Sequence, residues 1–255
     1  MRTRLWQSQT IERIDARAFD AARMQERRPA IIVGAMDGWK AFGTWSPGYL
    51  ASVLTDREVR VAVSKNHKYD YTPATTAFEN LTQFQKVPMG FSQFVTKLQN
   101  ARAAGEHYYL MQRPIQDDFP ELLPDIQRPR WIADRKVVTN LWVGSAGNVT
   151  QMHYDRDDNF LAEVYGSKHI RLFDPEQSEL LYPYPRESVM YYLSYVDCDH
   201  PDFEKYPRFR EARPWECVLE PSEILYLPAR WWHQVRSLDD AISVNFWWDA
   251  DLPKA

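Results

Sequence analysis

The chain has 255 residues and a formal net charge of −4, and 44% of its residues are hydrophobic and 14% aromatic. This composition is sufficient for a packed core, and the negative charge gives no support to a general binder of nucleic acids or anionic membranes. The first residues contain no apolar signal segment, and no run approaches the roughly 20 apolar residues of a membrane span. We therefore expect a soluble, cytoplasmic protein that has no membrane partner.

The first half of the chain alternates between helical and extended patterns. A helix is predicted over residues 16–27, because helices commonly end before a proline such as Pro29, and a strand follows at 30–33. Ser46 and Pro47 have the pattern of an N-cap followed by proline at the first helical position, so a second helix begins there. Further predicted elements are a strand at 58–64, a helix at 91–100 and a strand at 108–112. Residues 1–136 are therefore expected to form an α/β flank.

From residue 137 the pattern changes to short, closely spaced strands, which favours a β-sandwich or a small barrel. A mainly-β core is therefore expected over residues 137–250. A loop inserted at 182–214 is too long for a simple connection and is expected to cover a site. The strands are predicted at 137–143, 149–154, 160–165, 168–173, 217–219, 224–227, 232–237 and 241–248, with a short helical segment at 176–181.

The domain organisation is expected to be simple. No linker, repeat or low-complexity segment interrupts the sequence, which favours a single domain over residues 1–255. Two cysteines, Cys198 and Cys217, are too few for a disulfide framework. They could pair, but two reduced thiols are the simpler interpretation for a cytosolic protein.

The strongest chemical pattern is a His-x-Asp triplet. His153, Tyr154 and Asp155 close one of the predicted strands. Because residues two apart on a strand point to the same face, His153 and Asp155 can reach one metal ion while Tyr154 faces away. Such a triplet arises readily by chance. His233, near the start of a later predicted strand, is a third candidate ligand.

Two imidazoles and one carboxylate on one face form the facial triad of non-haem Fe(II) oxygenases, which leaves coordination positions open for a co-substrate and O2. A structural zinc site is instead closed and commonly Cys-rich, and neither cysteine lies near these histidines in sequence. The alternative interpretation of His233 is a core histidine bonded to the backbone. Together the three residues favour an Fe(II) site of His153, Asp155 and His233.

Several motifs resemble the JmjC family of 2-oxoglutarate- and Fe(II)-dependent oxygenases, which are cupin-like proteins. Within that family the similarity is greatest to asparaginyl hydroxylases of the factor-inhibiting-HIF type. Weaker similarity reaches back to near residue 30. The residues that carry the resemblance are Asn148, Val149, Thr150, His153, Asp155, Asn159, Phe160, Gly166, Lys168 and the segments 180–185, 225–228, 231–233 and 244–247.

The resemblance implies a double-stranded β-helix, or jelly-roll, core with the N-terminal α/β elements packed on it. It also implies ligands for the co-substrate. Lys168 would pair with the distal carboxylate of 2-oxoglutarate, and the hydroxyls of Thr150 and Tyr109 would donate hydrogen bonds to the same carboxylate. Asn159 and Asn245 resemble the amides that lie near the metal-bound end of the co-substrate in the family.

Some of these roles have alternatives. An inward-pointing Lys168 needs an anionic partner, whereas a surface lysine would lay its stem on the protein and keep its ammonium in water. Tyr108 is the alternative to Tyr109, since a slip of one residue reverses the face of a strand. Asn is disfavoured in strands, so Asn245 suggests a functional polar group, and a satisfied core amide is the alternative.

By resemblance, the chain uses Fe(II), 2-oxoglutarate and O2 to hydroxylate a substrate carbon, with succinate and CO2 as products. The expected substrate is an Asn, Asp or His side chain of a protein or peptide, with the 182–214 loop as one wall of a groove. A hydroxylase of a modified tRNA base or a small molecule is the second interpretation, and a nucleic-acid partner is not favoured by the acidic charge. Lysine demethylation is a weaker interpretation, because the sequence shows no reader domain of the kind that such enzymes often carry. A non-catalytic metal-binding cupin module is the alternative from another class, and the oligomeric state is open.

Overall fold

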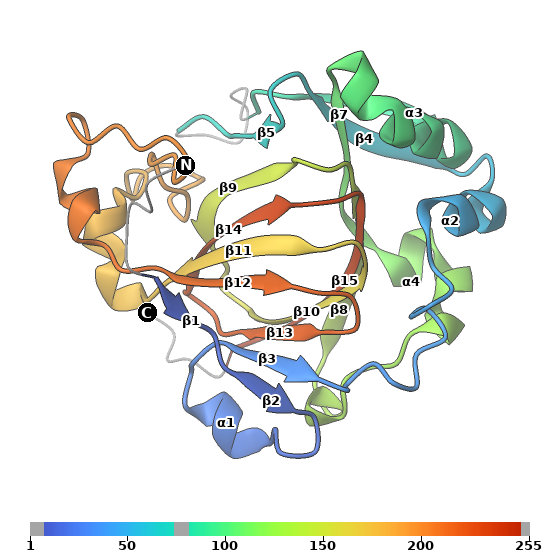
Figure 1. Ribbon diagram of the computed structural model, residues 1–255, viewed down its shortest axis with the longest axis horizontal. Coiled ribbons are helices and arrows are strands. Elements are labelled where there is room, and N and C mark those ends of the chain that lie inside the picture. The colour runs from blue at the N-terminus through green and yellow to red at the C-terminus, as the bar shows by residue number, and fades with distance from the viewer. Residues whose placement is uncertain (1–7, 74–81, 251–255) are drawn as a thin grey trace.

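The computed structural model describes residues 8–73 and 82–250, which form two β-sheets and several short helices (Figure 1). The six-stranded sheet contains, from edge to edge, β1 (Gln9–Thr10), β12 (Trp215–Leu219), β11 (Lys168–Phe173), β14 (Trp232–Ser237), β9 (Val149–Tyr154) and β5 (Lys68–Tyr69). The nine-stranded sheet contains β2 (Arg13–Asp15), β3 (Ala30–Val33), β13 (Ile224–Leu227), β10 (Asp158–Tyr165), β15 (Ala241–Trp248), β8 (Val137–Gly144), β7 (His107–Pro114), β4 (Glu58–Ser64) and β6 (Gln85–Gly90).

The strands from β8 to β15 form a jelly roll. Along the chain they pass from one sheet to the other at almost every turn, so that β9, β14, β11 and β12 face β8, β15, β10 and β13. Their pairings are antiparallel throughout. Two sheets connected in this way enclose an interior between them. The prediction of a mainly-β jelly-roll core is therefore confirmed.

The N-terminal flank extends both sheets. β1 adds to β12 and β5 adds to β9, each in parallel, while β2 and β3 continue the nine-stranded sheet beyond β13. β7, β4 and β6 continue that sheet beyond β8. The helices are α1 (Ala21–Gln25), α2 (Pro47–Leu54), α3 (Phe91–Ala104) and α4 (Ile115–Asp118), with 3-10 turns at Pro120–Asp125, Arg130–Ile132, Pro175–Leu181 and Pro207–Glu211. Among the described residues, no helix is both long and apolar enough to cross a membrane.

The largest buried cluster lies on the outer face of the nine-stranded sheet. Helix α3 lies beside β7 and β4, and α2 packs on α3 (Figure 1). Together the two helices contribute buried apolar residues such as Leu50, Phe91 and Phe94 to this cluster. A second cluster, which includes Ile170, Leu225 and Leu227, fills part of the interior between the two sheets. Apolar burial on both faces of the nine-stranded sheet fixes its strands, because shifting one strand by a single residue would exchange the two faces.

The helix ends follow the sequence signals. Ser46 is the N-cap of α2, its hydroxyl accepts the N–H of Tyr49 at 3.1 Å, and Pro47 occupies the first turn. The helix predicted at 91–100 is present as α3 and continues to Ala104, where Gly105 ends it in the left-handed region with φ 64°. Both starting points were therefore predicted correctly.

The helix predicted over residues 16–27 is wrong in extent, because α1 covers only Ala21–Gln25. The Asp15 carboxylate accepts the backbone N–H of Arg17 at 2.8 Å, which holds a turn before the helix. Asp20 then caps α1 by accepting the N–H of Arg23 at 3.1 Å. Side chains of Asp compete with helical backbone bonds in this way, so a composition rich in Ala and Arg did not extend the helix.

The 182–214 loop packs on the outer face of the six-stranded sheet, on the left of Figure 1. Val196 and Phe209 of the loop, together with Leu181 just before it, pack against Met152 and Trp232 in one buried cluster. Both cysteines are free and buried, as the simpler interpretation of the sequence required. Burial raises the pKa of each cysteine thiol to about 12, so both thiols are protonated near neutral pH.

Gly166 forms the turn between β10 and β11 and is expected to be irreplaceable. It has φ +73°, and a Cβ there would collide with the carbonyl oxygen of Asp240. We expect Gly166→Ala to lower the free energy of unfolding by about 3 kcal/mol or more, the combined cost of backbone strain and a backbone collision. Gly43→Ala is the matched control, since Gly43 has φ +81° and no atom within 4 Å of an added Cβ. It should lose only about 1–2 kcal/mol, and equal losses in urea unfolding would contradict the assignment.

Candidate active site

The interior of the jelly roll is lined by every second residue of its strands. On β10 the inward series is Asn159, Leu161 and then Glu163, while Phe160 and Ala162 face the outer cluster. On β15 the inward series is Ser243, Asn245 and Trp247. These series place several polar groups inside an otherwise apolar space. They surround a cavity between the two sheets.

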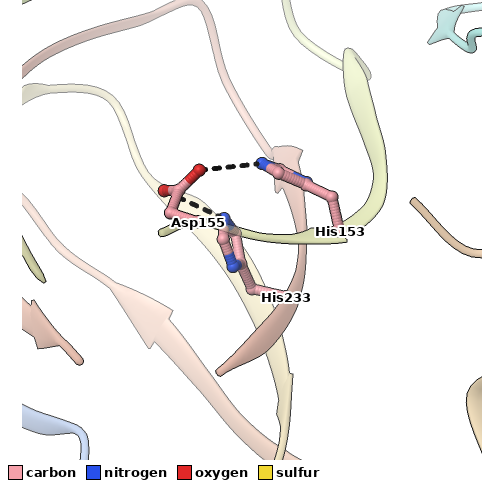
Figure 2. Close-up of side chains that lie close together, drawn as sticks. All are labelled: His153, Asp155 and His233. Atoms are coloured by element: carbon pink, nitrogen blue, oxygen red, sulfur yellow. Dashed lines mark ion pairs between the residues drawn. The ribbon is translucent and has the colours of Figure 1, made fainter. Parts of the chain in front are cut away.

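Three of the predicted residues meet at one place in this cavity (Figure 2). Ligand atoms of His153, Asp155 and His233 all lie within 4.8 Å of one another. Each imidazole Nε2 is 3.8 Å from a different oxygen of the Asp155 carboxylate. His153 lies one residue before the end of β9, His233 lies opposite it on β14, and Asp155 follows directly after the end of β9. The sequence therefore predicted the cluster, although the strand stops one residue short of it.

The two imidazoles are oriented by the backbone. The Nδ1 atom of His153 is 2.7 Å from the carbonyl oxygen of Gln151, and that of His233 is 3.0 Å from the carbonyl oxygen of Trp231. A carbonyl can only accept, so each Nδ1 carries the proton and each Nε2 presents a lone pair to the centre of the group. This is the arrangement in which histidine binds a metal ion.

The electrostatics of the group fit a bound cation. Burial raises the pKa of Asp155, and burial together with the charge of His153 lowers the pKa of His233 well below its usual value. The Trp247 indole N–H lies near enough to Asp155 to lower its pKa, but it is buried without a hydrogen bond of good geometry. A divalent ion would compensate the buried carboxylate and use both imidazole lone pairs. The donor set therefore fits a metal ion of the kind that non-haem iron proteins bind.

Asn245 lies at the centre of a buried amide network beside this group. Its Oδ1 accepts from the Trp142 indole N–H at 2.7 Å and from Asn140 Nδ2 at 3.2 Å. Its Nδ2 donates to Asn159 Oδ1 at 3.1 Å. Asn245 is thus a satisfied buried amide, and it also lines the cavity together with Asn159. The network fixes the side chain of Asn159 on the cavity wall.

Tyr109, and not Tyr108, faces the cavity. Tyr109 lines it together with Thr150, whereas Tyr108 packs in the outer cluster and bonds Glu106 through its hydroxyl. Burial raises the pKa of Tyr109 far above its usual value, and a hydrogen bond with Thr150 offsets this only in part. Gly144 lies opposite Tyr109, and any Cβ there would meet the Tyr109 ring at 2.8 Å. The ring therefore reaches the cavity because residue 144 has no side chain.

Lys168 points into the cavity and is 3% exposed, so it is not a surface lysine. Its Nζ lies 2.9 and 3.2 Å from the two carboxylate oxygens of Glu163, and it also bonds Ser243. Sequence reasoning identified Lys168 and its need for an anion, but it missed Glu163 and Ser243. Both continue inward series that start from predicted residues, two positions from Leu161 on β10 and from Asn245 on β15. That alternation was the available signal.

The 182–214 loop reaches the side of the cavity that holds the His-Asp-His group. Tyr192 accepts the N–H of Tyr154 through its carbonyl oxygen at 3.1 Å, and Leu193 forms a bridge with His153. The Tyr154 ring packs against both Tyr191 and Tyr192. The charge of Asp155 contributes to the raised pKa of Tyr192, behind the larger effect of burial, which shows that this hydroxyl is near the candidate site. The loop therefore forms an aromatic border next to His153.

The sequence is similar to a known family over most of its length. A family profile described as a cupin-like domain matches residues 16–253. Lysine-specific demethylase 8 of Xenopus tropicalis is 34% identical over 87% of this chain and 48% of that protein. Lysine-specific demethylase JMJ30 of Arabidopsis thaliana is 35% identical over 86% of this chain and 49% of that protein.

A relative with a different name matches more of its own length. tRNA wybutosine-synthesizing protein 5 of Danio rerio is 30% identical over 92% of this chain and 73% of that protein. The chain thus spans about half the length of the two demethylases and most of the third relative. The profile match and these relatives agree with the jelly-roll fold. The chain belongs to the family of cupin-like JmjC domains.

Proposed function

We propose that this chain is a 2-oxoglutarate- and Fe(II)-dependent dioxygenase that hydroxylates an Asn, Asp or His side chain of a protein or peptide. The observation that carries the proposal is the presence of a His-Asp-His group and a buried lysine in the same cavity. The first can hold a metal ion, and the second can hold an anion. A non-catalytic metal module would have no use for a buried cation at a distance from its metal.

The spacing of these two groups supports a short dicarboxylate between them. Leu172 of β11 lies opposite His233 of β14, and Lys168 lies four residues earlier on β11. At about 3.3 Å per residue, the two backbone positions are about 13 Å apart. The side chains of Lys168 and His233 extend into the same cavity from its two ends. A keto-acid carboxylate near the metal ligands and a distal carboxylate near Lys168 would fit this arrangement.

Each predicted residue has a role that its position supports. Fe(II) and 2-oxoglutarate, when bound, would supply the oxidising chemistry that turns O2 into a new hydroxyl group, with succinate and CO2 as products. Lys168, with the hydroxyls of Thr150 and Tyr109, would hold the distal carboxylate. Asn159 and Asn245 would position the other end, and the apolar walls would exclude water. His153, Asp155 and His233 would hold the metal from one side.

The substrate proposal rests on the aromatic border beside His153. Tyr191 and Tyr192 of the loop present half-buried rings there, with Tyr154 packed against them on the outer face of the six-stranded sheet, and such rings suit contact with an extended peptide. A second candidate, hydroxylation of a modified tRNA base, is favoured by the Danio rerio relative named for wybutosine synthesis. The relatives named lysine-specific demethylases make N-methyl-lysine peptides a third class to test.

Lys168→Ala should weaken the binding of 2-oxoglutarate far more than that of the metal. Loss of one partner of a buried charge pair costs about 2–5 kcal/mol, which corresponds to a rise of about 30-fold or more in the dissociation constant. Titration of the Mn(II)-loaded protein with 2-oxoglutarate measures this, and a separate Mn(II) titration shows whether the metal site is intact. Lys68→Ala is the matched control, because Lys68 pairs with Asp197 outside this cavity. Equal weakening of metal and co-substrate would count against the role of Lys168.

Substrate-coupled turnover should depend on Asp155 and reveal the substrate class. We expect succinate formation to rise with a peptide pool that carries Asn, Asp and His, and to stay at background for Asp155→Ala. Asp157→Ala is the control, since Asp157 is an exposed carboxylate two residues further along. Mass spectrometry should then show one added oxygen on the peptide. Stimulation only by tRNA, or only by N-methyl-lysine peptides, would replace the proposed substrate with that class.

A further inference from the structure

Glu163 is a buried carboxylate that the proposed function leaves without a role. It is 0% exposed, and it sits behind the cavity wall on the same face of β10 as Asn159 and Leu161. Its oxygens lie 2.9 and 3.2 Å from Lys168 Nζ. The Ser243 hydroxyl donates to Glu163 Oε2 at 2.8 Å and bonds the same ammonium. Lys168 therefore already has an anionic partner before any co-substrate binds.

The surroundings of Glu163 contain few other charges. From β11 it meets Lys168, and from β7 the Tyr109 phenol, whose pKa its negative charge helps to raise. From β15 it meets the neutral Ser243. On the β13 side its contacts are backbone only, with Ser222 N and Glu223 O, and the carboxylate of Glu223 is turned away toward Arg13. Among the described residues, Lys168 is the one cation that bonds Glu163.

A second carboxylate at Lys168 creates a conflict of charge. The distal carboxylate of 2-oxoglutarate and the carboxylate of Glu163 would share one ammonium in a space with little water. Two like charges at such a site cannot both stay ionised without a large cost, so one of them takes up a proton. The distal carboxylate reaches Lys168 from the cavity, whereas Glu163 is fully enclosed. Glu163 is therefore the group that becomes neutral.

We propose that Glu163 is a positioning residue that holds Lys168 before 2-oxoglutarate binds and releases it by taking up one proton, so that co-substrate binding weakens as the pH rises. This rests on the proposed function, because it requires 2-oxoglutarate to bind at Lys168. It makes an internal carboxylate, and not only the metal ligands, a determinant of co-substrate affinity. The proton comes from solvent, and apart from the protonation of Glu163 no covalent bond is made or broken.

The ionisation of Glu163 places this effect near neutral pH. Burial raises the pKa of Glu163 to about 7, although Lys168 and Ser243 both act to lower it. A second anion beside Lys168 raises that pKa further. Below the pKa that Glu163 has without co-substrate, Glu163 is already neutral, so co-substrate binding takes up no proton and is strongest. Between this pKa and the higher pKa of Glu163 in the complex, each bound co-substrate takes up one proton. In that range the affinity for 2-oxoglutarate falls by up to about tenfold per pH unit.

Calorimetric titration of the Mn(II)-loaded protein with 2-oxoglutarate tests the proposal without turnover. Buffers with different ionisation enthalpies give the number of protons taken up, which we expect to approach one per co-substrate at about pH 8. The dissociation constant should rise about tenfold or more between about pH 6.5 and pH 8.5. Pyruvate, which lacks the distal carboxylate, is the control ligand and should bind with no proton uptake.

Glu163→Gln keeps the shape of the side chain and removes its charge. This variant should bind 2-oxoglutarate with no proton uptake and with little dependence on pH, and at about pH 8 it should bind about tenfold more tightly than the original protein. Ser243→Ala removes a hydrogen bond that lowers the pKa of Glu163 and should move the pH dependence to higher pH. It provides a second test if the Gln variant does not fold.

The outcomes separate this inference from the proposed function. If 2-oxoglutarate binds without proton uptake, or if Glu163→Gln keeps the pH dependence of the original protein, the role of Glu163 is refuted and the oxygenase proposal stands. If the metal-loaded protein binds no 2-oxoglutarate at any pH, the proposed function itself fails.

Discussion

The pairing of His153 with His233 across β9 and β14 is the constraint on which the candidate site depends. It brings together two imidazoles that are 80 positions apart in the chain, with ring centroids 4.1 Å apart. A slip of one residue in either strand would turn one ring to the outer face, where Trp232 packs under the 182–214 loop. Burial on both faces of the six-stranded sheet makes that slip costly. The fold thus holds the geometry of the candidate metal ligands by packing, and the backbone carbonyls of Gln151 and Trp231 orient the two rings.

The same interior holds charges of both signs in separate places. Asp155 lies beside two histidines, and Lys168 lies beside Glu163. Isolated charges in such a place would be strongly destabilising, and paired ones give little net stability. Retaining them therefore points to binding and not to folding. Apolar residues such as Leu161 and Ile170 line the cavity between these two charged groups. They keep the space dry, which strengthens the attraction of each charged group for a ligand.

The sequence was most informative where one periodicity governed a segment. The strands at 149–154, 168–173, 224–227, 232–237 and 241–248 have the predicted bounds, because both of their faces are buried and turn residues end them. The short edge strands β1, β2 and β5 were missed, since two or three residues carry no readable alternation. The edge strand β6 was missed because it contains Pro88, which is unusual inside a strand. The predicted helix at 16–27 failed because local Asp side chains decided its start.

The candidate site likewise contains some residues that the sequence could suggest and others that only the fold brings together. His153, Asp155, His233 and Lys168 could be chosen as candidates because charged and metal-ligating side chains are unusual in or directly beside buried strands, and because these residues resemble a known family. Which of two adjacent tyrosines faces inward depended on the register of β7 with β8, which a single sequence does not contain. Glu163 looked like an ordinary strand residue, since only the fold brings it to Lys168. Partners across a sheet are set by register, and register is a property of the whole fold.

We propose above all that this cavity binds ferrous iron and a 2-oxo acid together. Anaerobic titration of the protein with Fe(II) and then with 2-oxoglutarate tests it directly, because a 2-oxo acid that coordinates ferrous iron gives a weak visible absorption band. We expect this band in the original protein and in His169→Ala, whose histidine lies near Glu216 and outside the cavity. The band should be absent in His233→Ala. Iron binding with no band on addition of 2-oxoglutarate would contradict the account and leave a metal-binding cupin without this co-substrate.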